Sequence, residues 1–288
     1  MKHVYIHIPF CKNICSYCDF CKMYHLPKFT ENYFEALRKE VEDSYMDELI
    51  NTIYIGGGTP SCLTNEELDK LFNIVNIFKK STDCEFTFEC NPEDITEELI
   101  TYLIKNGVNR LSIGVESFNK ENLEFMERKM DYKDLEEKLN MIRAKGINNI
   151  NLDLIYALPN ESLDILKKDV KKLLKLNPEH ISTYSLIIEE DTKLKLNNTS
   201  YIDEELDAKM YDYICSKLKK NYTHYEVSNF AKEGFESKHN MAYWLNEEYY
   251  GFGLGASGYI NGFRYENTHN LDDYIEGKYH KEESLLSN

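Results

Sequence analysis

Short apolar, β-branched runs alternate with longer amphipathic segments along the first two thirds of the chain. The short runs predict six strands, over His3–Ile8, Thr52–Ile55, Glu85–Glu89, Arg110–Val115, Asn149–Ile155 and His180–Ile187. Apolar residues at helical spacing predict helices between them, over Thr30–Leu49, Thr64–Lys79, Thr96–Lys105, Tyr132–Lys145 and Ser162–Leu176. This alternation predicts an α/β fold with parallel strands and crossover helices, either an open doubly wound sheet or a complete or partial barrel.

Polar or glycine residues stand where the predicted strands end, and they favour the barrel. They are Gly56–Thr59, Glu89, Glu116, Asp153 and Glu189. In β/α barrels the reacting groups gather at this carboxyl-terminal edge, contributed by several strands. We therefore expect a polar ligand at this edge.

The rhythm changes after Glu190. A helix is predicted over Asp203–Lys220, and a strand outside the repeat over Tyr222–Phe230. We expect residues 1–194 to form a partial barrel and residues 195–288 a small α+β extension packed on it.

The charge and composition narrow the function classes. The net charge of −16 over 288 residues disfavours a sequence-independent grip on a nucleic-acid backbone. We expect no nucleic-acid partner, and we interpret the lysines of the last predicted barrel helix as a solvated face. No signal peptide precedes the first predicted strand and no apolar run approaches the length that spans a bilayer, so we expect a cytoplasmic protein that is not an integral membrane protein. Eight cysteines in such a protein indicate metal or redox chemistry.

Three of those cysteines, Cys11, Cys15 and Cys18, follow the first strand at C-x3-C-x2-C spacing. Soft thiolates at this spacing suit an iron–sulfur cluster, and three ligands would leave one iron open to a cofactor or substrate. A disulfide knot and a zinc site fit less well, because nothing else indicates secretion and no second metal-binding pair follows. A closed electron-transfer cluster that also uses Cys21 is the strongest alternative.

Four charged residues form the predicted surroundings of a polar ligand: Glu89, Glu116, Asp153 and Arg128. A carboxylate can accept from a hydroxyl or amino group, and an arginine can pair with a carboxylate. Each residue taken singly is as well explained by a structural salt bridge. The loop Gly56–Ser61 can approach a ligand with its backbone and present its amides, but a tight turn also explains it.

His239 lies in a His-Asn-x-x-Tyr-Trp stretch that offers an imidazole beside two aromatic rings. It is a candidate heme or porphyrin contact. A hydrogen-bonded packing histidine is the alternative that the residues themselves favour.

Taken together and in order, these motifs resemble the radical S-adenosylmethionine (SAM) superfamily, and within it the group of oxygen-independent coproporphyrinogen III oxidase and the heme chaperone HemW. The three-cysteine loop, the glycine loop and the stretch Gly107–Val115 carry the resemblance. It implies a partial (β/α)6 barrel with a [4Fe-4S] cluster on Cys11, Cys15 and Cys18. It also implies SAM binding by Tyr5, Gly57, Gly58, Thr59, Glu89, Glu116, Arg128 and Asp153.

Within this group the chain more closely resembles the chaperone branch. Phe20 stands where the oxidase branch has a further cysteine, and the stretch from His239 is associated with heme binding in the chaperone branch. The resemblance implies a protein that binds heme at His239 and delivers it to an acceptor, with a membrane heme acceptor and an electron donor as partners. The alternatives are a radical SAM enzyme, either an oxygen-independent coproporphyrinogen III dehydrogenase or a related methyltransferase.

The chain departs from the family pattern at several places. Glu116 stands in place of glutamine and Ala157 in place of glycine, and Cys21 is additional. The C-terminal extension also looks shorter than in the longer relatives. Glu116 and Ala157 bear on the SAM contacts, Cys21 bears on the cluster ligands, and the shorter extension bears on heme handling.

Overall fold

The computed structural model describes residues 2–285, with side chains up to residue 280. Six parallel strands stand side by side in chain order. They are β1 (Lys2–Ile8), β4 (Leu49–Gly57), β5 (Lys79–Cys90), β6 (Arg110–Glu116), β7 (Asn149–Tyr156) and β8 (His180–Ser185). The sheet stays open at both edges within the described residues, so the predicted partial (β/α)6 barrel is confirmed.

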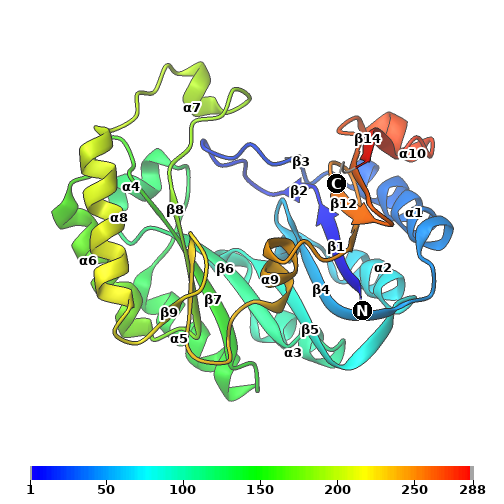
Figure 1. The fold of residues 1–288 in the computed structure, drawn as a ribbon, viewed down its shortest axis with the longest axis horizontal. Helices are drawn as coiled ribbons and strands as arrows, with labels where there is room; N and C mark the ends of the chain where they lie inside the picture. Colours follow the sequence, from blue (N-terminus) through cyan, green and yellow to red (C-terminus); the bar gives the residue numbers. More distant parts are fainter. Residues whose placement is uncertain (1, 286–288) are drawn as a thin grey trace.

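Crossover helices cover the outer face of this curved sheet (Figure 1). They are α1 (Pro27–Ser44), α2 (Asn65–Val75), α3 (Glu97–Lys105), α5 (Tyr132–Ala144) and α6 (Leu163–Leu176), with α8 (Glu204–Leu218) packed beside α6. Side chains such as Thr64 and Ser162 cap the helix starts. The shorter helices are α4 (Lys120–Phe125), α7 (Lys193–Leu196), α9 (Lys238–Trp244) and α10 (Leu271–Ile275).

Residues after 195 contribute to both edges of the sheet. On one side β10 (Asn229–Ala231) pairs with β8 and β9 (Thr223–His224) pairs with β10, both antiparallel. On the other side β11 (Tyr249–Phe252) pairs in parallel with β1. It is followed by β12 (Ser257–Ile260), β13 (Phe263–Asn267) and β14 (His280–Leu285). The division of the chain at residue 194 into two domains stays a prediction.

Two boundary predictions are wrong for the same reason. The first two predicted helices extend to Leu49 and Lys79, but α1 ends at Ser44 and α2 at Val75. Leu49 and Lys79 are register partners in the β4–β5 ladder. Strand pairing therefore overrides the local helical pattern at both ends.

The single strand predicted over residues 222–230 is also wrong. The chain forms β9 and β10 instead, joined by a turn in which the Glu226 carboxylate accepts from the Ser228 amide and the Asn229 side chain. Val227 at the tip of this turn is 60% exposed. The local hydrogen bonds of Glu226 thus reverse the chain where apolar alternation predicts continuity.

The buried carboxyl group of Glu40 ties α1 to the C-terminal strands. It accepts hydrogen bonds from Gly253 N (2.9 Å), Asn267 Nδ2 (2.6 Å) and the Tyr274 hydroxyl (2.5 Å). Burial raises the pKa of Glu40 from 4.5 to about 7, although the three donors oppose the shift. The packing of the C-terminal residues on α1 is therefore coupled to the charge of one side chain.

This coupling predicts a pH effect on stability. Because the folded-state pKa is raised, Glu40 favours the folded chain at low pH, and that contribution is lost as the pH rises from 4.5 through about 7. The loss is on the order of 3 kcal/mol, from about 1.4 kcal/mol per pKa unit. We expect Glu40→Gln to remove this part of the dependence, as measured by denaturant unfolding between pH 5 and pH 8. Glu42→Gln, at a half-exposed position on the same helix, is the matched control. Parallel profiles for the wild type and the Glu40 variant would contradict the coupling.

Candidate cofactor and ligand cavity

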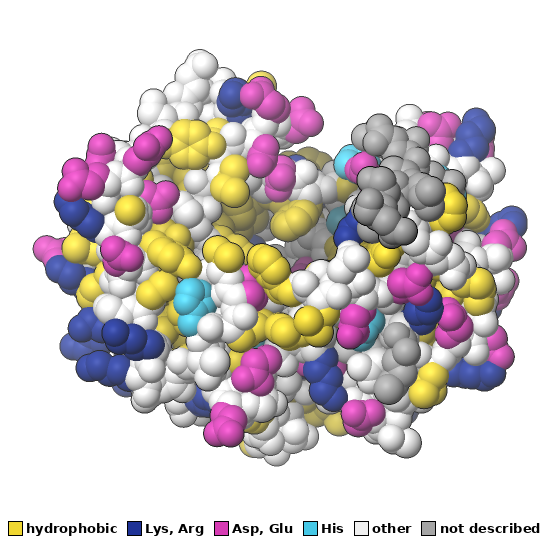
Figure 2. All heavy atoms as spheres, viewed as in Figure 1, with side chains coloured by type: hydrophobic (Ala, Val, Ile, Leu, Met, Phe, Trp, Pro, Cys, Tyr) yellow, Lys and Arg dark blue, Asp and Glu magenta, His cyan; other side chains and the backbone are white. Residues whose placement is uncertain are grey.

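A cavity of about 480 Å³ runs through the inside of the partial barrel. Figure 2 shows the hollow near the centre of the molecule, with hydrophobic side chains along its edge. Residues from the cysteine loop line it together with residues from the starts and ends of the strands. We call the end beside the cysteine loop the mouth (Cys11, Cys15, Cys18, Glu89, Glu116) and the opposite end the floor (Arg110, Asn151, His180, His239, Asn240). Arg110 and Glu116 begin and end β6, so mouth and floor lie about 20 Å apart.

The cysteine loop is anchored in its middle and at both ends, which pair with each other as β2 (Phe10–Cys11) and β3 (Met23–Tyr24). At its start, Phe10 is fully buried and packs edge-on against Tyr33. In its middle, the Ser16 hydroxyl donates to Phe125 O (2.8 Å) at the end of α4. The loop is therefore held across the mouth rather than left free.

The structure brings Cys11, Cys15 and Cys18 together on the wall of the cavity. Burial raises the pKa of the Cys11 thiol, and it raises the pKa of Cys18 to about 11. Near neutral pH such thiols keep their protons until a metal displaces them. No three His, Cys, Asp or Glu side chains among residues 2–280 converge on a single metal ion. A cluster needs no such convergence, because each thiolate binds a different iron.

Cys21 lies apart from the other three and does not line the cavity. Its side chain packs on Gly255, where an added Cβ would come within 2.6 Å of Cys21 Cβ. Its carbonyl oxygen accepts from His7 Nε2 (2.7 Å), and His7 Nδ1 in turn accepts from the Tyr5 hydroxyl (2.9 Å). Cys21 thus connects the loop to β1.

Arg128 joins the cysteine loop to the strand ends. Its Nη1 donates to Asn91 Oδ1 (2.8 Å) and contacts Cys15 Sγ (3.7 Å), and its Nη2 donates to the Gly114 carbonyl. The Glu116 carboxylate lies 4.0 Å from Nη2. Burial raises the pKa of Glu116 to about 7, although Arg128 acts in the opposite direction.

Glu89 and Asp153 complete the carboxylates around the mouth. Glu89 Oε1 accepts from the Tyr54 hydroxyl (2.7 Å), and Asp153 Oδ1 accepts from Asn151 Nδ2 (2.7 Å). Burial raises the pKa of Glu89 to about 7 and also raises that of Asp153. Three of the carboxylates predicted from the strand ends, Glu89, Glu116 and Asp153, therefore face one volume, where a cationic ligand would restore their charge.

The backbone amides of Gly57, Gly58 and Thr59 in the glycine loop form hydrogen bonds within the protein. Gly57 N donates to Glu89 Oε2 (3.0 Å), Gly58 N to Ile8 O (2.7 Å) and Thr59 N to Phe10 O (2.8 Å). These three amides hold the cysteine loop and Glu89 in place, while Gly57, Gly58 and Thr59 also line the cavity, so their part in SAM binding stays a prediction. Gly58 is required for this approach, since an added Cβ would lie 2.8 Å from Phe10 O.

Two of the departures from the family pattern, at the end of β6 and just after β7, have a left-handed backbone. Glu116 has φ +67° and Ala157 has φ +62°. Glycine adopts this conformation without strain, which explains physically why a glycine is expected at position 157. Non-glycine residues held in this region cluster at binding sites, and Glu116 is one that lines the cavity.

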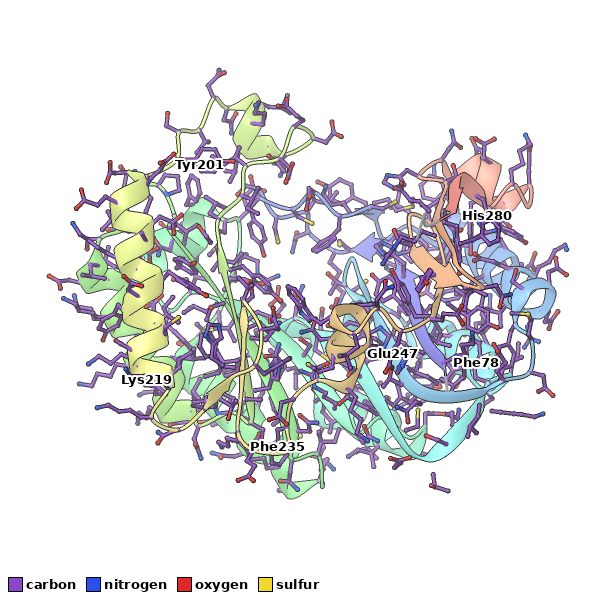
Figure 3. All side chains as sticks on the ribbon, in the orientation of Figure 1. Phe78, Tyr201, Lys219, Phe235, Glu247 and His280 are labelled. Atoms are coloured by element: carbon purple, nitrogen blue, oxygen red, sulfur yellow. The ribbon has the colours of Figure 1, made fainter. Side chains whose placement is uncertain are left out.

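A chain of four hydrogen bonds leads from the surface to the floor. Glu247, which follows α9 and is labelled in Figure 3, pairs with His3 Nε2 (2.7 Å). His3 Nδ1 contacts Thr52 Oγ1 (2.9 Å), and Thr52 Oγ1 contacts His239 Nδ1 (2.6 Å). His239 Nε2 contacts the Tyr243 hydroxyl (2.8 Å). We call this chain of hydrogen bonds the relay. His3 and Thr52 are register partners in β1 and β4, so strand pairing positions the middle of the relay.

Comparison with known proteins gives two results on the sequence. The Radical SAM superfamily model matches residues 5–173. The heme chaperone HemW of Lactococcus lactis is 43% identical over 278 residues, which cover 94% of this chain and 73% of that protein. HemW of Bacillus subtilis is 42% identical, with 96% and 76% covered. The chain belongs to the radical SAM superfamily, in its HemW branch.

Coproporphyrinogen III oxidase (HemN) from Escherichia coli, a radical SAM enzyme, has the same fold. It superposes with a TM-score of 0.88 over 99% of this chain and 72% of that one, at 23% identity. As a member of the radical SAM superfamily the chain has a [4Fe-4S] cluster and SAM as its cofactors, and the mouth suits them. It offers thiols for a cluster and carboxylates beside a buried arginine for a cationic amino acid.

Sequence reasoning missed several residues of this radical SAM cavity. Asn91, which orients Arg128, and Tyr184, which lines the cavity, carry no pattern of their own. Arg110 stands inside the stretch Gly107–Val115 that carries the family resemblance, and a charged residue on an otherwise apolar strand could have identified it.

The structure contains no helix among its described residues that is long and apolar enough to cross a membrane.

Proposed function

We propose that this protein is a radical SAM heme chaperone of the HemW type, binding SAM at the mouth of its cavity and heme through His239 at the floor. The observation that carries the proposal is the 43% identity to a HemW over 94% of the chain. The arrangement of the cavity supports it, since both candidate sites open into one volume.

At the mouth, Cys11, Cys15 and Cys18 would hold the cluster and leave one iron for SAM. Arg128 would receive the SAM carboxylate, while the remaining SAM residues surround it: Tyr5, Gly57, Gly58, Thr59, Glu89, Glu116 and Asp153. When bound, the cluster and SAM supply reductive cleavage of SAM to methionine and a 5'-deoxyadenosyl radical. The chain positions these groups and keeps water out.

The relay prepares His239 as an iron ligand by fixing its tautomer. Burial lowers the pKa of both His3 and His239, so both rings are neutral near pH 7. The Glu247 carboxylate accepts from His3 Nε2–H, which leaves His3 Nδ1 to accept from the Thr52 hydroxyl. Thr52 Oγ1 then accepts from His239 Nδ1–H, and the lone pair stays on Nε2.

His239 Nε2 is therefore the atom that would bind heme iron. In the structure, His239 Nε2 accepts a hydrogen bond from the hydroxyl of Tyr243. Tyr243 lines the cavity and is 39% exposed. Heme would displace that hydroxyl, while Thr52 would keep the ring oriented from the other side, as outer-shell partners do for metal-binding histidines.

Thr52→Val tests this orienting role. Valine keeps the β-branched shape of a fully buried strand residue but removes the acceptor for His239 Nδ1–H. We expect heme affinity to fall about 10- to 100-fold, the usual effect of losing such a partner. Thr183→Val, also buried on a strand but bonded to Ser228 O, is the matched control. Equal heme affinity in the two variants would show that Thr52 does not orient the iron ligand.

The partners follow from the chaperone proposal. We expect the protein to act in the cytoplasm, to receive electrons for its cluster from a reductant protein and to pass heme to a membrane acceptor. The alternative function is radical enzymology on a porphyrinogen, for which the same cavity would serve as a substrate pocket.

One experiment distinguishes the two functions. The cluster-reconstituted protein is supplied anaerobically with SAM and a reductant, and it is offered heme or coproporphyrinogen III in parallel. We expect heme to bind and to pass to an apo-protein that takes up heme, with no decarboxylation of coproporphyrinogen. Multiple turnovers of coproporphyrinogen would overturn the chaperone proposal in favour of the enzyme.

A further inference from the structure

A buried arginine that forms no ion pair with a described residue lies at the floor of the cavity. Arg110 is the first residue of β6, is 2% exposed and lines the cavity. None of the cofactor contacts described above uses it.

The hydrogen bonds of Arg110 leave most of its guanidinium unsatisfied. Its one side-chain bond to a described residue runs from Nη1 to Thr87 Oγ1 and is long, at 3.5 Å. Its Nε is buried and has no partner. No carboxylate of the described residues lies within 4.0 Å to form an ion pair with it. A buried charge left in this state destabilises a fold unless a ligand completes it.

The neighbours of Arg110 do not neutralise it. Asp153 is close enough for Arg110 to oppose the rise of its pKa, but burial still raises that pKa. Burial, assisted by the charge of Arg110, holds the pKa of His180 and His239 well below its ordinary value. His180 is bonded at both nitrogens, to Asn151 Oδ1 and the Tyr225 hydroxyl (2.7 Å each). Arg110 therefore places a positive charge at the floor of the cavity.

We infer that Arg110 binds a propionate carboxylate of the tetrapyrrole that His239 receives. A planar guanidinium with free donors matches a carboxylate in a two-pronged geometry, and a water-poor cavity strengthens the pair. Arg110 and His239 line the same end of the cavity, so iron and carboxylate would be held together. The inference rests on the proposed heme function, and it assigns Arg110 as a specificity residue for tetrapyrroles with free carboxylates.

Thermal stability distinguishes a ligand-binding role of Arg110 from a purely structural role. Replacing a well-paired buried arginine destabilises a protein, whereas replacing an unpaired one by an apolar side chain of similar length is neutral or stabilising. We expect Arg110→Met to unfold at the same or a higher temperature than the wild type in the absence of heme. Arg143→Met, which removes an arginine bonded to Leu176 O and Asn177 O and paired with Glu179, should unfold at a lower temperature.

The binding test compares protoporphyrin IX with its dimethyl ester, which lacks the carboxylates. Fluorescence titration of the wild type should show about 30-fold or more tighter binding of the free acid, the effect expected for one buried charge pair. Arg110→Met should lose this preference, and Arg143→Met should keep it. Equal binding of acid and ester by the wild type would overturn the inference without any variant.

The outcomes separate this inference from the chaperone proposal. If heme does not bind the wild type at all, the chaperone proposal fails. If heme binds but Arg110→Met keeps the preference for the free acid, the assignment of Arg110 fails and the chaperone proposal stands. A lower unfolding temperature of Arg110→Met together with unchanged acid preference would assign Arg110 to the fold.

Discussion

We expect Cys15→Ser to abolish the [4Fe-4S] cluster and Cys21→Ser to leave it intact. Cys15 lines the cavity beside Arg128, while the Cys21 side chain packs against Gly255, away from the cavity. Serine cannot replace a thiolate that binds iron, so we expect Cys15→Ser to retain almost no iron or sulfide after anaerobic reconstitution.

Iron and sulfide per chain and the EPR signal of the reduced cluster measure this difference. Cys21→Ser is the matched control, because both residues are half-buried on the same loop. A cluster that disappears with Cys21→Ser would mean that Cys21 is a ligand as well, which would leave no iron open to SAM, and a cluster that survives Cys15→Ser would mean that Cys15 is not a required ligand.

The second large effect concerns SAM. Arg128→Met removes the buried cation that we assign to the SAM carboxylate, and it leaves the Glu116 carboxylate without its nearest cation. Breaking one partner of a buried charge pair costs about 2–5 kcal/mol, so the Kd for SAM should rise about 30-fold or more. Equilibrium dialysis with the reconstituted protein measures this constant.

Lys12→Met is the control for Arg128→Met. Lys12 is a cation on the same cysteine loop, but it is 58% exposed and pairs with Asp94 (2.6 Å). We expect it to leave SAM affinity within about twofold, since exposed pairs contribute little. If the two variants bound SAM equally well at equal cluster content, Arg128 would have no part in the SAM site.

The sequence predicted the parallel barrel because each strand is a short apolar run bounded by a capped helix. It failed where non-local pairing decides, as at Leu49 and Lys79, whose mutual register ends two helices early. It also failed at Glu226, where local hydrogen bonds turn the chain. Local pattern thus predicts which elements exist, and tertiary contacts set their ends.

The candidate site divides in the same way. The cysteines and strand-end carboxylates could be predicted, since spacing and barrel geometry place them at one edge. The Thr52–His239 contact joins residues 187 positions apart, and the Glu40–Tyr274 contact joins residues 234 apart. No local pattern encodes such pairs. The unpaired state of Arg110 is likewise visible only once its surroundings are in place.

Heme binding at His239 is tested most directly by an anaerobic heme titration of the cluster-reconstituted wild type beside His239→Ala, followed by absorption. We expect saturable binding of one heme per chain by the wild type, with affinity at least about 100-fold lower in the variant because alanine offers no iron ligand. Equal binding by both proteins would place heme elsewhere, and no saturable binding by the wild type would contradict a heme chaperone.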